Sequence, residues 1–274
     1  MAGMFETKAG IVNMKFFLMS ALVSFLLLGC VTVPETGRRA FILTSEAEEN
    51  QLGRQAYSEV LGKERLSTNH RWNQILQRVG QRIAAAANRP DYQWEFKLIE
   101  SKEKNAFCLP GGKVAVYTGI LSVCQNEAGL ATVIGHEVAH ATARHGGQRM
   151  TVALGSQLGL AALSAAIGGE DTSQKRLILA ALGVGTTVGA ILPFSRANEA
   201  EADEIGLIYM ARAGYDPREA PKFWGRFAGE GGGTPTFLST HPSSESRTQA
   251  LSAQVSRVLP IFERSPKFGL GEML

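Results

Sequence analysis

The chain has 274 residues, 45% of them hydrophobic, which is enough apolar material for the core of one large domain. Its formal net charge is only +3 and its basic residues are not clustered, which excludes a nucleic-acid-binding protein. No internal repeat is present, so an appended helical-repeat domain is not expected either.

The first 29 residues have the composition of a secretory signal peptide. A short positive region, Met14-Lys15, precedes an apolar stretch at residues 16–28 that is too short for a comfortable transmembrane span. Met14 is the better translation start, because residues 1–13 add nothing that a signal needs. Leu27-Leu28-Gly29-Cys30 is similar to a bacterial lipobox, so we expect cleavage before Cys30 and lipid on its thiol. An uncleaved anchor or a buried cysteine is the alternative.

Cys30 also bears on the compartment. Val31 stands where an aspartate would indicate retention in the inner membrane, so we expect a lipid anchor in the outer membrane, facing the periplasm. Residues 30–44 would then form a lipidated tether. The sequence leaves open whether Cys108 and Cys124 form a disulfide or remain free buried thiols.

Hydrophobic periodicity predicts two helices and three strands before the middle of the chain. The first helix opens with a capping-box pattern, Ser45 and Glu48. The predicted elements are helices at 46–60 and 69–87 and strands at 92–98, 105–109 and 113–117.

The most informative segment is His136-Glu137-Val138-Ala139-His140, an H-E-x-x-H pattern within an apolar stretch that Asn126 can cap. Residues four apart share one face of a helix, so both imidazoles can point at a single metal ion. Glu137 can then act on water without replacing a ligand. A buried helix with these polar groups needs compensation, which a metal ion supplies.

A catalytic zinc ion usually has three protein ligands, so a third is expected downstream. Glu199 and Asp203 lie at i, i+4 spacing, so one can bind the metal while the other fixes a ligating histidine. The spacing equally fits an acidic, solvated helix face, to which Glu201 and Glu204 would belong.

These motifs resemble the gluzincin peptidases of family M48, which include HtpX, the CAAX prenyl proteases and the Oma-type proteases. The core of the resemblance is H-E-x-x-H followed by E-x-x-x-D, from Glu199 to Asp203, and the similarity covers roughly residues 45–257. Further matching segments are Asn105 to Gly112, Val116 to Gly119, Ala141 to His145, Ser195-Arg196, Ala213 to Pro217, and Thr240-His241-Pro242 through Arg247.

The resemblance implies a mostly helical α+β fold, with a small β-sheet bordering the active-site cleft and a zinc metallopeptidase domain at residues 45–260. It also implies one zinc ion per chain, with Glu137 as the general base. The zinc ligands would be His136, His140 and Glu199. Asp203 and Arg196 would contact these ligands on the side that faces away from the metal.

We expect different roles for two histidines outside the H-E-x-x-H motif, His241 and His145. His241 would take part in catalysis, either by stabilising the oxyanion or by occupying the fourth zinc position. His145 lies nine residues after His136, so on a continuous helix it would point away from the metal.

Substrate is expected to bind beside the strand at 113–117, because peptides often add a strand to a sheet edge. Val114 and Val116 lie on this strand, and Gly111 and Gly112 would permit close backbone approach. A simple glycine-rich hairpin turn is the alternative.

Two apolar runs, 152–167 and 177–192, are rich in small residues, so we expect helices packed by the cleft rather than a membrane hairpin. Residues 230–236 should form a loop and 243–258 a helix. The C-terminal tail, 261–274, is expected to be loose.

The sequence thus predicts a zinc endopeptidase that hydrolyses misfolded or misassembled cell-envelope proteins at the membrane. The alternative is a non-proteolytic, chaperone-like assembly factor that uses the same cleft. An intact base argues against this alternative, because a binding module needs none.

Overall fold

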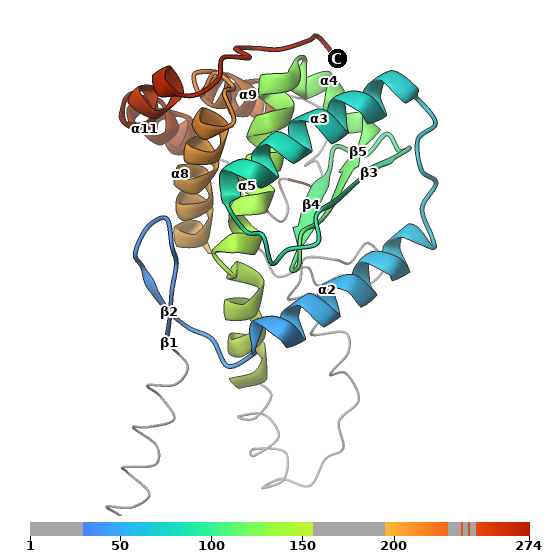
Figure 1. The fold of residues 1–274 in the computed structure, drawn as a ribbon, viewed down its shortest axis with the longest axis vertical. Helices are drawn as coiled ribbons and strands as arrows, with labels where there is room; N and C mark the ends of the chain where they lie inside the picture. The colour runs from blue at the N-terminus through green and yellow to red at the C-terminus, as the bar shows by residue number, and fades with distance from the viewer. Residues whose placement is uncertain (1–29, 156–194, 230–236, 238–240, 242–244) are drawn as a thin grey trace, which may run out of the picture.

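The computed structural model describes residues 30–155, 195–229, 237, 241 and 245–274 (Figure 1). The predicted signal peptide, most of the two apolar runs and the loop at 230–236 lie outside the described residues. Among the helices of the described residues, none is long and apolar enough to cross a membrane.

The fold is α+β, mostly helical, as the sequence predicts. Its principal helices are α2 (Glu46–Leu61), α3 (His70–Ala87), α5 (Glu127–Thr142), α8 (Arg196–Arg212), α9 (Glu219–Ala228) and α11 (Glu245–Arg264). The strands are β1 (Cys30–Thr32), β2 (Arg39–Phe41), β3 (Glu95–Ile99), β4 (Ala106–Leu109) and β5 (Lys113–Tyr117), and the short η1 (Thr118–Ile120) and α4 (Leu121–Cys124) follow β5.

The helix boundaries follow from local chemistry. The predicted capping box is present: the Ser45 hydroxyl accepts from the Glu48 N–H at 3.2 Å, and the Ser45 N–H donates to the Glu48 carboxylate at 2.8 Å. Asn126 caps α5 by accepting from the Gly129 N–H at 2.9 Å. Asn88 caps the C-terminal end of α3, because asparagine tolerates the left-handed conformation that it adopts there, with φ 49°.

Helix α5 is the centre of the molecule, and all of its residues are buried. The sheet lies on one side of it and α8 on the other, while α3 packs across both α5 and β3 (Figure 1). The α5–α8 contact is very close, because a Cβ on Gly135 would lie 3.1 Å from the Gly206 carbonyl oxygen. Only glycines allow the two backbones this approach without displacement.

The strand order of the main sheet is β3-β5-β4, with β5 parallel to β3 and antiparallel to β4. The expectation that a peptide pairs with residues 113–117 is therefore wrong, because β5 has a hydrogen-bonded neighbour on each side. The edge strand that packs against α5 is β4.

The segment predicted to be a tether is largely part of the folded domain. β1 and β2 pair as an antiparallel hairpin, and Val33 between them is buried in the main core. Glu35 forms an ion pair with Arg212 at 2.7 Å, so the hairpin is attached to α8. The hydrophobic pattern did not reveal this because ion pairs such as Glu35–Arg212 join segments far apart in the sequence.

The C-terminal tail is also packed rather than loose. Helix α11 extends to Arg264, and the residues after it cross the start of α5. The Glu127 N–H donates to the Glu272 carbonyl at 2.9 Å, and the Ala128 N–H donates to the Leu270 carbonyl at 3.1 Å. The tail therefore satisfies amides that the first turn of a helix leaves without intrahelical partners.

Two glycines in the tail provide a matched test of this docking. Gly269 and Gly271 both have positive φ, of 60° and 66°, but only a Cβ on Gly271 would collide, at 2.6 Å from the Glu127 Cβ. Both alanine variants incur the left-handed backbone cost of about 1 kcal/mol. We expect Gly271→Ala to lower the free energy of unfolding by a further 1–3 kcal/mol or so. Equal thermal unfolding midpoints for Gly271→Ala and Gly269→Ala would contradict the docking.

Candidate metal centre

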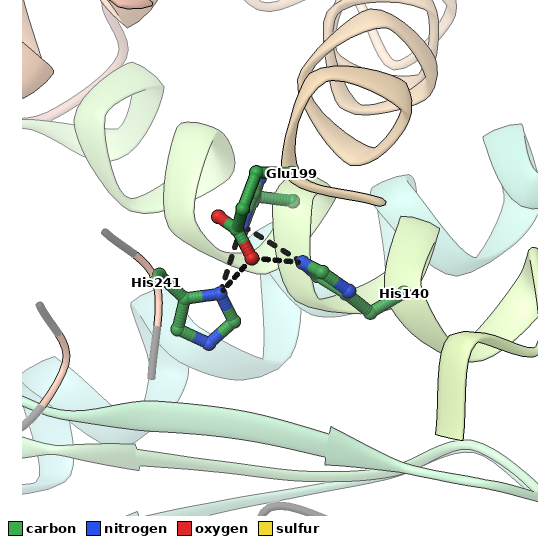
Figure 2. A group of neighbouring side chains, drawn as sticks. His140, Glu199 and His241 are labelled. Carbon is green, nitrogen blue, oxygen red and sulfur yellow. Dashed lines mark hydrogen bonds and ion pairs between the residues drawn. The ribbon is translucent and has the colours of Figure 1, made fainter. Parts of the chain in front are cut away.

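Four side chains from three parts of the chain converge on one buried point. His136 and His140 come from α5, Glu199 from the first turn of α8, and His241 from the segment before α11. One ligand atom from each lies within 4.8 Å of those from the others. Figure 2 shows the His140 ring, the Glu199 carboxylate and the His241 ring turned toward one another.

The distances between these atoms match those around a tetrahedral metal ion. The His136 and His140 Nε2 atoms lie 3.1 Å apart, and each is 3.4 Å from a Glu199 carboxylate oxygen. His241 Nδ1 lies 3.2 Å from His136 Nε2. Ligand atoms about 2.1 Å from a tetrahedral zinc ion are about 3.4 Å apart. The group can therefore hold one metal ion.

Asp203 lies behind His136, at the position the sequence predicts. Its Oδ1 is 3.0 Å from His136 Nδ1, the ring nitrogen that faces away from the group. Asp203 is i+4 from Glu199 on α8, so the same helix face delivers both carboxylates. This contact orients the His136 ring with Nε2 directed inward.

Arg247 is the arginine that contacts Asp203 and Glu199, and the expectation for Arg196 is wrong. Arg196 is exposed at the start of α8. Arg247 of α11 is buried, binds both Asp203 oxygens at 2.7 Å, and lies 3.1 Å from Glu199. Its guanidinium also stacks over the Trp224 ring at 3.5 Å. Arg247 is the last residue of the family-like segment that begins at Thr240, but nothing in the sequence indicated that it would bind Asp203.

His145 contacts the group, contrary to the helical-rotation argument. The rotation argument fails because α5 ends at Thr142 and Arg144 adopts a left-handed φ of 55°. The Arg144 guanidinium is held at this turn by Glu49, at 2.7 and 3.0 Å. His145 Nδ1 consequently lies 2.9 Å from His140 Nδ1.

Glu137 lies beside the group, also buried, and is not one of the four. His241 Nε2 is 3.4 Å from its Oε1, and the Cys108 backbone lies close to its carboxylate. Burial raises the pKa of Glu137 above its ordinary value, against the effect of the nearby histidines. A carboxyl with a raised pKa is suited to accept and return a proton near neutral pH.

The remaining carboxylates are held ionised. Burial opposes ionisation of Glu199, but the His241 charge and hydrogen bonds from His136 and His140 hold its pKa below the usual range. Burial likewise opposes ionisation of Asp203, and the Arg247 charge lowers its pKa despite this. Glu199 is therefore available as an ionised carboxylate ligand for a cation.

The two histidines of α5 differ in their proton affinity. Burial lowers the pKa of His140 well below its ordinary value. Burial and Arg247 also oppose a proton on His136, yet hydrogen bonds to Asp203 and Glu199 raise its pKa to about 9. His140 is therefore ready to bind a metal at neutral pH, whereas His136 must first lose a proton.

The glycines and valines expected to contact substrate are structural. Val114 and Val116 are fully buried on β5. Gly111 and Gly112 form the β4–β5 turn with φ of 82° and 83°, and a Cβ on Gly112 would lie 2.8 Å from Trp94. The simple-turn alternative therefore describes them. Cys108 and Cys124 are free thiols.

The chain is similar to known metallopeptidases over most of its length. A model of peptidase family M48 matches residues 70–255. The chain is 39% identical over 238 residues to the mitochondrial metalloendopeptidase OMA1 of Schizosaccharomyces pombe, covering 82% of this chain and 68% of that protein. It is 32% identical over 260 residues to OMA1 of Saccharomyces cerevisiae, covering 87% and 72%.

A bacterial relative is similar over a comparable stretch. The chain is 28% identical over 256 residues to the beta-barrel assembly-enhancing protease of Escherichia coli, covering 85% of this chain and 49% of that protein. It thus spans about half the length of this relative. Together with the convergence of H-E-x-x-H and E-x-x-x-D on one buried group, these matches establish that the chain belongs to peptidase family M48 and is a metalloendopeptidase.

Proposed function

We propose that this metalloendopeptidase binds one zinc ion through His136, His140 and Glu199 and hydrolyses misfolded or misassembled proteins of the cell envelope. The observation that carries the proposal is the tetrahedral spacing of these donors next to a buried carboxyl, Glu137. Three protein ligands with one further position are typical of catalytic zinc.

The donor chemistry of the group fits a cation. The outward Nδ1 atoms of His136 and His140 contact Asp203 and His145, which leaves both Nε2 atoms directed at each other, 3.1 Å apart. Once His136 has lost the proton that its raised pKa retains, these two Nε2 atoms are both acceptors and repel one another. A metal ion at the centre of the group removes this repulsion, because it accepts a lone pair from each.

In the proposed reaction, Glu137 takes a proton from the attacking water and returns it to the leaving amine. A bound zinc ion would polarise the scissile carbonyl and stabilise the oxyanion. The Cys108 backbone of β4 lies close to the Glu137 carboxylate, beside the metal ligands. Burial supports its role as a base by keeping its pKa raised.

We propose that substrate pairs with β4. The Tyr117 N–H donates to the Asn105 carbonyl at 3.0 Å, so the backbone groups of Asn105 face β5. In an antiparallel pair, residues whose backbone N–H and C=O groups face the partner strand alternate with residues whose groups face away. Cys108 therefore turns its backbone away from β5, toward Glu137. A peptide added along this edge would run past the base.

His241 is proposed to occupy the fourth metal position in the arrangement described. Its Nδ1 lies 3.0 Å from Glu199 and 3.2 Å from His136, which are ligand-to-ligand distances. Its Nε2 faces Glu137 at 3.4 Å, so the same ring can also contact a developing oxyanion after leaving the metal.

The proposed location is the bacterial cell envelope, with a lipid on Cys30 and the enzyme facing the periplasm from the outer membrane. The lipobox pattern and the bacterial relative named for β-barrel assembly support this location. Cys30 is exposed at the first residue of β1, where a lipid would not disturb the core. The OMA1 relatives are named as mitochondrial, so the fold itself does not determine the compartment.

Glu137→Gln tests the reaction. The variant keeps the shape of the side chain but cannot accept a proton, so we expect one zinc ion per chain and casein cleavage reduced about 10²- to 10⁴-fold. Glu204→Gln, which neutralises an exposed carboxylate on α8, is the control and should match wild type. Equal casein cleavage by Glu137→Gln and wild type would refute the proposed enzyme.

The pH dependence of zinc affinity tests the ligand set. His136 is protonated below about pH 9 in the zinc-free protein, so zinc must displace a proton there. We expect the apparent affinity, measured by competition with a chelator, to rise by up to about tenfold per pH unit and to level off above pH 9. Asp203→Asn should shift this dependence to lower pH, whereas an affinity constant between pH 7 and 9 contradicts the proposal.

Cys30→Ser tests the anchor. Cells that express the full chain and are fed a labelled fatty acid should incorporate label into wild type but not into Cys30→Ser. Cys108→Ser is the control for nonspecific acylation of a thiol and should keep the label. Label retained on Cys30→Ser would show that the lipid is elsewhere.

A further inference from the structure

The two histidines on α5 use different partners for their outward nitrogens. His136 Nδ1 contacts a carboxylate directly, whereas His140 Nδ1 contacts a second imidazole, His145 Nδ1, at 2.9 Å. His145 continues the contact, because its Nε2 lies 2.8 Å from Glu201 Oε2. His145 is fully buried and Glu201 is 8% exposed, so water competes little for these bonds.

Chemistry assigns one arrangement of protons along this series of residues. When His140 presents Nε2 to a metal, its Nδ1 carries the proton and donates to the unprotonated Nδ1 of His145. His145 then carries its proton on Nε2 and donates to the Glu201 carboxylate. In this arrangement each ring nitrogen of His140 and His145 has one role, as a hydrogen-bond donor, a hydrogen-bond acceptor or a metal ligand. The two hydrogen bonds fix both rings in the orientation that metal binding by His140 requires.

The carboxylate that ends the series is held by the N-terminal hairpin. Arg38, in the turn between β1 and β2, binds Glu201 Oε2 through Nε at 2.8 Å and through Nη2 at 2.6 Å. The Thr36 hydroxyl donates to Glu201 Oε1 at 2.5 Å. Glu201 is thus fixed by an ion pair with the Arg38 guanidinium at one oxygen and by the Thr36 hydroxyl at the other.

We propose that His145 and Glu201 are positioning residues for His140, and that the hairpin Cys30–Phe41 forms part of the metal site through Arg38. This inference rests on the proposed zinc ion. His145 and Glu201 touch neither substrate nor metal and act by orienting a ligand. The hairpin contributes to zinc affinity although the Arg38 side chain is 38% exposed and the hairpin supplies no ligand.

The contacts couple the beginning of the folded chain to the metal. If the hairpin raises zinc affinity by fixing Glu201, zinc must stabilise the docked hairpin by the same factor, because coupling between two sites is reciprocal. The segment that begins at Cys30 is therefore more firmly docked in the zinc-loaded protein than in the zinc-free protein.

Substitution of His145 in the full chain tests the series. His145→Phe keeps the ring but removes both nitrogens, so we expect zinc affinity, measured by chelator competition, to fall about 10- to 100-fold. His145→Asn places a polar atom near the former Nδ1 and should recover part of this loss. The absorption spectrum of the cobalt-substituted protein should change in His145→Phe and shift back toward wild type in His145→Asn.

Arg38→Met tests the hairpin, with Arg39→Met as the matched control. Arg39 is the exposed neighbour of Arg38, so its variant should bind zinc as wild type does. Arg38→Met should weaken zinc binding, by less than His145→Phe. Hydrogen exchange at Val33 and Gly37, whose amides close the hairpin, should slow when zinc is added to wild type and less so in Arg38→Met.

The outcomes separate this inference from the proposed function. If wild type binds no zinc, the proposed metal site is wrong and the inference is lost with it. If wild type binds zinc and His145→Phe binds it equally well with an unchanged cobalt spectrum, only the positioning role is overturned. Arg38→Met and Arg39→Met with equal affinities would remove the hairpin from the site.

Discussion

The close contact between α5 and α8 is the constraint on which the metal centre depends. The two helices supply His136 and His140 on one side and Glu199 and Asp203 on the other. Their backbones meet through Gly135 and Gly206, immediately before His136. Larger residues there would separate the helices, and side-chain atoms that must lie about 3 to 3.5 Å apart around one ion would no longer meet.

The elements around α5 and α8 supply hydrogen-bond and ion-pair partners for polar groups that are buried where the two helices meet. α11 brings Arg247 to Asp203 and Glu199, and the Arg144 turn brings His145 to His140. Asp203, Glu199 and His140 therefore each have a polar partner, which offsets part of the high cost of burying them. The C-terminal tail has a similar role for backbone groups, because it accepts from the first amides of α5.

The same arrangement explains why the site residues have such different proton affinities. Glu137 and Glu199 are both buried, but at Glu199 the His241 charge and the hydrogen bonds from His136 and His140 outweigh burial, so its pKa is lowered. At Glu137 burial outweighs the nearby histidines, so its pKa is raised. Two carboxyls of one site are thereby suited to separate tasks. One remains an ionised ligand, and the other can exchange a proton with the reacting groups.

The sequence by itself determined the features that depend on local spacing. The capping box at Ser45, the helical placement of His136 and His140, and the pairing of Glu199 with Asp203 all follow from residues three or four positions apart. Only the tertiary structure decided which arginine joins the site, which strand forms the sheet edge, and that His145 lies against His140. The physical reason is that these features depend on contacts between distant segments and on one left-handed residue, Arg144, just after α5. Neither has a signature in local periodicity.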